Sequence, residues 1–156
     1  MDAAIQAKKE GFYTKILPGI SAEDCLFSDL MIDPGSCGCQ SFEATDFLIH
    51  RKKHDNSAHL ILWQVDIIGV RHNPSSYNNE KGIRLLVNFL REQYSLEHEV
   101  YVYEAAQYPG FESKISKFPL KMLHEIKLSS ISTLYIPPAS KALCDESILK
   151  LLKEFE

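Results

Sequence analysis

Two kinds of apolar pattern alternate along this chain, and the alternation limits the fold more than any other feature. The run 60–65 (Leu-Ile-Leu-Trp-Gln-Val) is short and almost continuously apolar, which is typical of a buried strand. From Ile83 to Leu90, apolar residues recur at i, i+3, i+4 and i+7, which predicts one face of a helix. Strands interleaved with amphipathic helices indicate the α/β class, so we expect a mixed β-sheet with flanking helices.

The same patterns predict the remaining elements. Ser21-Ala22-Glu23-Asp24 fits a capping box, and Asp145 is a candidate N-cap for the last helix. The polar stretch 71–80 is expected to be a loop. We expect helices over 3–10, 21–30, 45–49, 83–90, 120–125 and 145–155, and strands over 12–17, 40–44, 60–65, 99–103, 112–118 and 131–136.

Size and charge exclude several classes of protein. The 156 residues correspond to one domain, or to half of a larger two-lobed one. The net charge of −4 argues against binding to a nucleic-acid backbone, which needs a concentrated basic face. Apolar runs of about four residues are far short of the roughly 20 that a membrane-spanning helix needs. With no apolar core in its first ten residues, the chain is expected to be cytoplasmic.

The four cysteines are interpreted as free thiols in a reducing compartment. Cys25 falls in the apolar pattern of a helix and is expected to be buried. Cys37-Gly38-Cys39 is the one close pair, but zinc sites use a longer spacing and a second pair of ligands. We therefore expect no metal site; Cys144 lies apart from the others.

Three places in the chain are candidates for binding a ligand. At Pro18-Gly19-Ile20-Ser21, a strand is expected to turn into a helix N-terminus, which is either an ordinary capped loop or a ligand-binding loop. Gln64 is an amide in an apolar strand, so it either pairs with backbone or is held at a strand end for a ligand. Thr133 is also a normal strand residue. No nucleophile–base pair is recognisable.

Three stretches together carry a resemblance to a known family. Leu-Pro-Gly-Ile-Ser-Ala-Glu-Asp (17–24), Ile-Leu-Trp-Gln-Val (61–65) and Ser-Thr-Leu-Tyr-Ile-Pro-Pro (132–138) resemble, in order and spacing, the tetrapyrrole (corrin/porphyrin) methylase superfamily, the class III S-adenosylmethionine-dependent methyltransferases. The sequences of residues 21–30 and 42–48 are similar to those of the branch that contains the borosin-type peptide backbone N-methyltransferases.

The resemblance implies two α/β lobes with S-adenosylmethionine between them. In this family the Pro-Gly-x-Ser/Thr-Ala loop contacts the cofactor, and so does a residue that follows a hydrophobic strand. Another loop closes over the adenosine. A strand near the end of the domain lines the adenine pocket. Hydroxyls, an amide and backbone edges suit a neutral adenosine site. The cofactor-binding residues implied here are Pro18, Gly19, Ser21, Ala22, Gln64, Ala106, Gln107 and Thr133.

The chain departs from the family pattern at its start. The Gly-rich strand–loop, the Gly-Asp-Pro-type loop and the Tyr and Arg residues near the transferred methyl have no counterpart. The resemblance therefore covers the carboxyl-terminal half, with 1–20 a remnant of the first lobe and 21–156 the second lobe. We expect a methyltransferase that is inactive alone and needs a first lobe, supplied by a separately encoded chain, or a homo-oligomer such as a homodimer.

Several functional points stay open from sequence. The catalytic residues are unassigned, and the methyl acceptor is either a peptide backbone or a tetrapyrrole-like small molecule. The alternative function is a non-catalytic remnant or binding module on the same fold. Fold alone does not choose among them.

Overall fold

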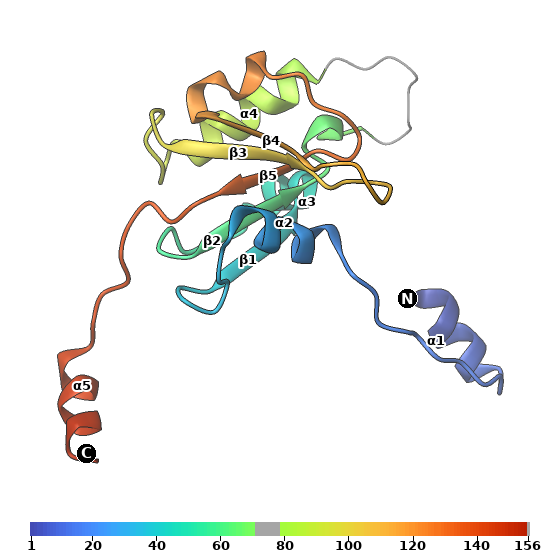
Figure 1. Cartoon of the computed structure of the whole chain (residues 1–156), viewed down its shortest axis with the longest axis horizontal. Helices are drawn as coiled ribbons and strands as arrows, with labels where there is room; N and C mark the ends of the chain where they lie inside the picture. The colour runs from blue at the N-terminus through green and yellow to red at the C-terminus, as the bar shows by residue number, and fades with distance from the viewer. Residues whose placement is uncertain (71–78, 156) are drawn as a thin grey trace.

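A computed structural model describes residues 1–70 and 79–155, and these residues contain one five-stranded mixed sheet (Figure 1). β1 runs parallel to β2, β5 runs antiparallel to both β2 and β3, and β4 forms an antiparallel hairpin with β3. The expected α/β class and mixed sheet are confirmed. In spatial order the strands are β1 (Cys39–Glu43), β2 (His59–Trp63), β5 (Thr133–Ile136), β3 (Glu99–Glu104) and β4 (Lys114–Pro119).

The pairing places the ends of three strands together. β1, β2 and β3 all run in the same direction, so their carboxyl ends meet at one edge of the sheet, here called the carboxyl edge. Leu62 pairs with Leu134, and Tyr103 pairs with Thr133. The residues that follow β2 and β3 therefore flank the residues that begin β5.

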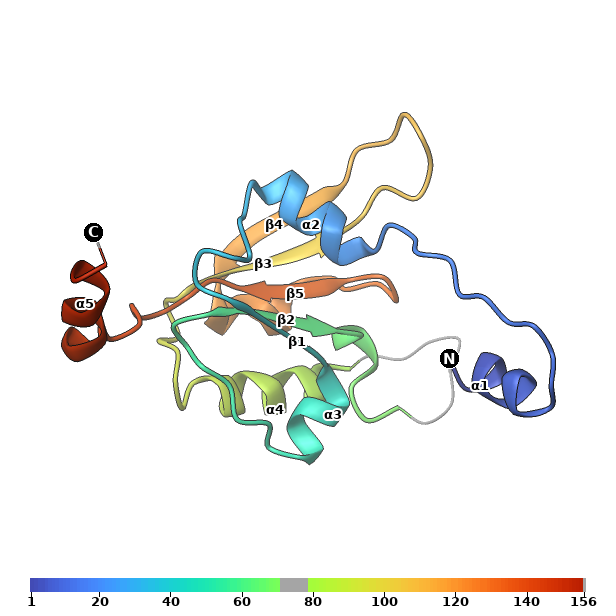
Figure 2. The ribbon, with the colours of Figure 1, turned by 90° about the horizontal axis from the view of Figure 1, so that it is seen from below.

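One face of the sheet, here called the closed face, carries the larger apolar core. It is covered by α3 (Ala44–Ile49), α4 (Glu80–Leu90) and the 3₁₀ helix η2 (Leu120–Glu125) (Figure 2). Leu86 of α4 packs in this core with Leu62 and Leu134. Because side chains alternate between the faces of a strand, every second residue of β2 and β5 joins this core.

The opposite face, here called the α2 face, is covered by α2 (Ala22–Leu30) (Figure 2). Fully buried Leu26 packs against Ile61, Tyr103 and Tyr135. Cys25 packs against this cluster but is only partly buried, so the prediction that it is buried is only partly correct.

Local sequence explains where the helices begin. The Ser21 hydroxyl accepts a hydrogen bond from the Asp24 backbone N–H at 3.2 Å, and the Asp24 carboxylate accepts one from the Ser21 N–H at 2.8 Å. The capping box is confirmed, and Asp145 is the N-cap of α5 (Glu146–Lys153), where its carboxylate accepts from the backbone N–H groups of Ser147 and Ile148. The expected helix over 120–125 is a 3₁₀ helix. The predicted loop 71–80 lies outside the described residues except for Asn79, which is the N-cap of α4, and Glu80, which is the first residue of α4 and not part of a loop.

Two strand predictions are corrected. Residues 12–17 form no strand and pair with no described strand, and Phe12 and Ile16 are 65% and 63% exposed. β-prone side chains do not make a strand unless a neighbouring strand is present to share hydrogen bonds. The strand over 60–65 ends at Trp63, because Gln64 has a left-handed backbone conformation (φ 57°) that turns the chain into the 3₁₀ helix η1 (Val65–Ile67).

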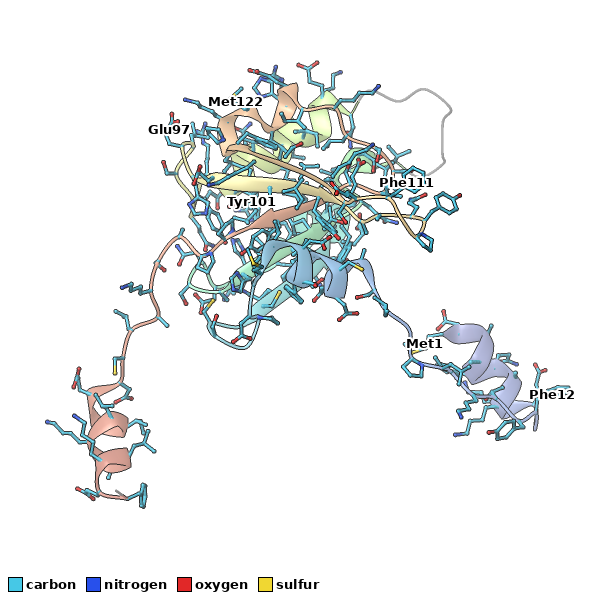
Figure 3. All side chains as sticks on the ribbon, viewed as in Figure 1. Met1, Phe12, Glu97, Tyr101, Phe111 and Met122 are labelled. Atoms are coloured by element: carbon cyan, nitrogen blue, oxygen red, sulfur yellow. The ribbon has the colours of Figure 1, made fainter. Side chains whose placement is uncertain are left out.

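The two ends of the chain extend away from the sheet (Figures 1 and 3). The amino-terminal arm contains α1 (Asp2–Lys9) and the carboxyl-terminal arm contains α5, and neither helix has a buried residue. Leu151, Leu152 and Phe155 are exposed. Among the described residues, none of the helices is long and apolar enough to cross a membrane.

Candidate functional site

The carboxyl edge brings together predicted site residues from three distant parts of the sequence. Gln64 follows β2, Ala106 and Gln107 follow β3, and Thr133 is the first residue of β5. The strand register sets these segments side by side. In α/β folds the carboxyl ends of the parallel strands are the usual place for a ligand.

Gln64 is exposed and lies just beyond β2 rather than within it. The expected burial of its amide is wrong, because the left-handed turn at Gln64 rotates the side chain out of the strand pattern. The position at a strand end agrees with one of the two interpretations that the sequence left open, and the ligand contact itself stays a prediction.

Thr133 is only 2% exposed and shares the α2 face with Tyr135, two residues further along β5. Ile131, two residues before β5, is 43% exposed and contacts solvent at this edge. Thr133 therefore forms an inner wall of the edge in this conformation.

The loop that leads into α2 holds the remaining predicted residues. Pro18 and Gly19 are exposed, and a Cβ added at Gly19 would meet no atom within 4 Å. The Ser21 hydroxyl donates to the Asp24 carboxylate at 2.8 Å, so it serves the helix cap in this conformation. Ala22 is partly buried in the first turn of α2.

A cavity of about 770 Å³ connects this loop with the carboxyl edge. Ile20 and Ala106 both line it, whereas Ser21, Gln64 and Thr133 do not. The structure therefore joins the α2 loop to the β3–β4 loop. Gln64 and Thr133 lie near each other for a different reason, because the pairing of β2 with β5 places the end of β2 beside the start of β5. A second cavity of about 280 Å³ is lined by Ala106, Gln107 and Ile131.

Sequence reasoning missed Glu104, which ends β3 at the carboxyl edge. Ser129 and Ser132 donate hydroxyl hydrogen bonds to its Oε1 at 2.5 and 2.7 Å, and the Lys114 ammonium lies 3.5 Å from its Oε2. Partial burial raises the pKa of Glu104, but the two hydroxyls and Lys114 outweigh burial, so its pKa is lowered. An acidic residue at the end of the alternating run 100–103 was the available signal.

Sequence reasoning also missed a chain of hydrogen bonds that ties α2 to the β3–β4 loop. The Tyr103 hydroxyl donates to Asp29 at 2.7 Å and lies 3.3 Å from the Ser113 hydroxyl. The Ser113 hydroxyl accepts from the Ala106 N–H at 3.2 Å. Burial, with the nearby Asp29 carboxylate, raises the pKa of Tyr103 to about 12, so it stays a donor at neutral pH. Ala106 is thereby held in place from α2.

Within residues 1–70 and 79–155, no group of three or more His, Cys, Asp or Glu side chains is arranged to hold a metal ion. The described polar groups of the carboxyl edge are the exposed Gln64 amide, the backbone after β2 and β3, and the Glu104 carboxylate, which Ser129, Ser132 and Lys114 already occupy. This set suits a neutral, nucleoside-like ligand better than a cation.

Curated relatives match nearly the whole chain. It is 40% identical over 152 residues to the methyltransferase/ribosomally synthesized cyclic peptide dendrothelin A precursor of Dendrothele bispora, with 94% of this chain and 36% of that protein covered. The omphalotin A precursor of Omphalotus olearius is 38% identical with the same coverage. No protein-family profile matches. The resemblance to the borosin branch is confirmed. The chain spans about a third of the length of these relatives.

Solved structures confirm the fold. A putative diphthine synthase from Entamoeba histolytica has a TM-score of 0.62 at 18% identity, with 99% of this chain and 64% of that chain covered. A uroporphyrin-III C-methyltransferase from Thermus thermophilus, complexed with S-adenosyl homocysteine, has a TM-score of 0.57 at 11% identity and covers 87% of this chain and 55% of that one. The chain therefore has a tetrapyrrole methylase-like fold.

Proposed function

We propose that the chain is part of an S-adenosylmethionine-dependent methyltransferase that acts on a peptide backbone. The observation that carries this proposal is the 40% identity, over 94% of the chain, to a protein named as a methyltransferase and cyclic peptide precursor. The predicted cofactor residues that gather at the carboxyl edge support it. Residues 1–20 are assigned to a first lobe and 21–156 to the second lobe.

The residues present fit the adenosine half of the cofactor. The Gln64 amide offers both a donor and an acceptor at the strand end, and the backbone of Ala106 and Gln107 borders a cavity of about 280 Å³. Thr133 closes the inner side of the edge. The bound cofactor supplies a methyl group on a sulfonium, and transfer needs mainly in-line positioning of the acceptor nitrogen. The chain's own contribution is to bind and orient the nucleoside.

The described chain alone is proposed to be a weak binder without methyltransferase activity. A micromolar ligand has a binding free energy of about −8 kcal/mol. Each missing charge-assisted hydrogen bond from a first lobe costs about 1.5–3 kcal/mol, so two or three losses bring the affinity toward millimolar. The catalytic groups are proposed to belong to that lobe.

The exposed apolar side chains of both arms favour association. Ile16, Leu151 and Leu152 are each more than half exposed, and other exposed residues of each arm are also apolar. Exposed apolar patches mark interaction surfaces. A homo-oligomer is the proposed assembly, and sedimentation velocity across a concentration series measures it. A chain that stays monomeric would contradict this part of the proposal.

Titration of the isotope-labelled chain with S-adenosylhomocysteine tests the cofactor site. Amide chemical shifts of Gln64, Ala106 and Gln107 are expected to move together and to approach saturation at near-millimolar ligand. A Gln64→Ala variant is expected to weaken the binding, whereas Gln93→Ala, a matched exposed glutamine after α4, leaves it unchanged. Shifts confined to other regions, or no shifts, would contradict the proposed site. Low-micromolar binding by a monomer would overturn the two-lobe assignment.

A further inference from the structure

The cavity of about 770 Å³ is a groove between α2 and the loop that joins β3 to β4, and it is here called the α2 groove. Figure 2 shows that loop rising beside α2 on the same side of the sheet, and Figure 3 shows Phe111 at its outer end. Ile20 and Phe111 in its lining are 86% and 71% exposed. Ile115 adds a further apolar side chain. The groove thus offers apolar walls that no other part of the described chain covers.

The charges of the α2 groove all have one sign. Asp24, Asp29 and Glu112 line it, and its lining contains no Lys, Arg or His. Hydrogen bonds from Ser21 lower the pKa of Asp24, and those from Ser113 and Tyr103 lower the pKa of Asp29, so both are ionised at neutral pH. The groove therefore combines apolar walls with uncompensated negative charge.

The nearest basic residues of β4 are occupied elsewhere. The Lys117 ammonium lies 2.8 Å from Glu99, and the Lys114 ammonium lies 3.5 Å from Glu104. Neither lysine lines the groove. A cation that enters the groove would therefore meet carboxylates that neither lysine neutralises.

The shape of the groove is fixed before anything binds. The Tyr103 hydroxyl donates to Asp29 of α2 and lies 3.3 Å from the Ser113 hydroxyl of the β3–β4 loop, so it links the two walls. Tyr103 is fully buried in the cluster below α2. A preformed groove spares a ligand the entropic cost of ordering the site.

We propose that the α2 groove binds a peptide segment in which a lysine or arginine lies between apolar residues. Apolar walls suit the flanking side chains, and the carboxylates complement the single cation. The inference rests on the proposed function, because it takes the methyl acceptor to be a peptide. Ala106 lies both in the groove and in the loop proposed to border the adenosine, so a peptide held here would lead toward the cofactor.

The test compares three fluorescein-labelled heptapeptides, Gly-Val-Ile-X-Val-Ile-Gly with X as Lys, Gln or Glu, by fluorescence anisotropy at low ionic strength. The Lys peptide is expected to bind about tenfold more tightly than the Gln peptide, and the Glu peptide most weakly. Added salt is expected to reduce the difference. Equal affinities for the three peptides, or no binding, would overturn the proposal.

Two variants locate the binding. Glu112→Gln and Asp29→Asn are each expected to weaken binding of the Lys peptide about three- to tenfold and to leave the Gln peptide unchanged. Asn keeps an oxygen that accepts from Tyr103, so the Asp29→Asn chain retains the tie between α2 and the loop. Glu154→Gln, in the carboxyl-terminal arm, is the matched control and is expected to change nothing. Unchanged binding in both groove variants would overturn the proposal.

Two further outcomes identify other occupants. Displacement of the Lys peptide by S-adenosylhomocysteine would assign the groove to the cofactor, and a change of oligomeric state in Glu112→Gln would assign it to a second copy; either would overturn the proposal. Charge-dependent peptide binding without cofactor shifts at Gln64 would support the groove and contradict the proposed cofactor site. Cofactor-induced shifts at Gln64, together with equal affinities for the Lys, Gln and Glu peptides, would support the proposed cofactor site and contradict the peptide groove.

Discussion

The two faces of the sheet carry side-chain clusters of different size and composition. On the closed face, α3, α4 and η2 cover a layer of aliphatic and aromatic side chains that includes Leu62, Leu86 and Leu134. On the α2 face, one helix covers a smaller layer in which Tyr103 and Tyr135 carry buried hydroxyls. Both hydroxyls are hydrogen-bonded, and the α2 face buries fewer apolar side chains than the closed face, so it is the smaller core.

What the α2 face gains in return is a set of fixed polar groups close to the carboxyl edge. Tyr103 connects to Asp29 and to the loop that holds Ala106. Tyr135 lies 2.7 Å from the ring nitrogen of His59. The closed face thus supplies stability, while the α2 face positions the candidate site and the α2 groove.

The largest expected effect concerns the closed face. Leu86→Ala removes a fully buried side chain from the larger core and is expected to lower the free energy of unfolding by about 2–5 kcal/mol. Leu26→Ala on the α2 face is expected to fall at the lower end of that range, because its cluster is smaller and can relax more easily. Urea denaturation measures both. A larger loss for Leu26→Ala would break the assignment of stability to the closed face.

The next effect concerns the tie between α2 and the β3–β4 loop. Tyr103→Phe removes a hydrogen bond to a carboxylate and is expected to cost about 1.5–3 kcal/mol of unfolding free energy. Tyr101→Phe is the matched control on the same strand and face, and Tyr101 is only partly buried. Equal losses in the two variants, measured by urea denaturation, would show that the Asp29 bond does not stabilise the chain.

A smaller effect is expected at Glu104. Its pKa is lowered in the folded chain, so its ionised form stabilises the fold above the unfolded value of about 4.3. That contribution is lost as the pH falls through the folded pKa, because the folded state must then take up a proton. Glu104→Gln is therefore expected to be less stable than the natural chain at pH 7, with the difference shrinking toward pH 3. A difference independent of pH would contradict this ionic role.

Sequence reasoning succeeded where local chemistry decides the structure. The capping box of α2, the N-cap of α5, the α4 periodicity and the strands of the sheet depend on neighbouring residues or on strong apolar patterns. The strand predicted over 12–17 failed because a strand requires a partner, and no local pattern reports one. The position of Gln64 was missed because a left-handed turn at a non-glycine residue leaves little trace in sequence.

The candidate site was partly predictable for the same reason. The resemblance pointed to Gln64, Ala106 and Thr133, and strand register brings those segments to one edge. Glu104 and Asp29 were not singled out, because each acquires its role only through residues distant in sequence, such as Ser132 and Tyr103. Cross-strand and helix–sheet contacts of this kind appear only when the topology is known.

The smallest expected effect is a pH dependence that belongs to the α2 face alone. His59 is 8% exposed, and burial lowers its pKa, with the nearby Asp33 acting in the opposite direction. The unfolded chain, in which the histidine pKa is about 6.5, then takes up a proton more readily than the folded chain. The free energy of unfolding is therefore expected to fall as the pH is lowered from 7.5 to 5.5.

Urea denaturation at both pH values should show a smaller fall for His59→Gln than for the natural chain. Gln93→Ala, which changes an exposed side chain that carries no charge, is the control and is expected to keep the natural slope. If His59→Gln keeps it too, burial on the α2 face imposes no electrostatic cost, and the contrast between the two faces would be reduced to their size.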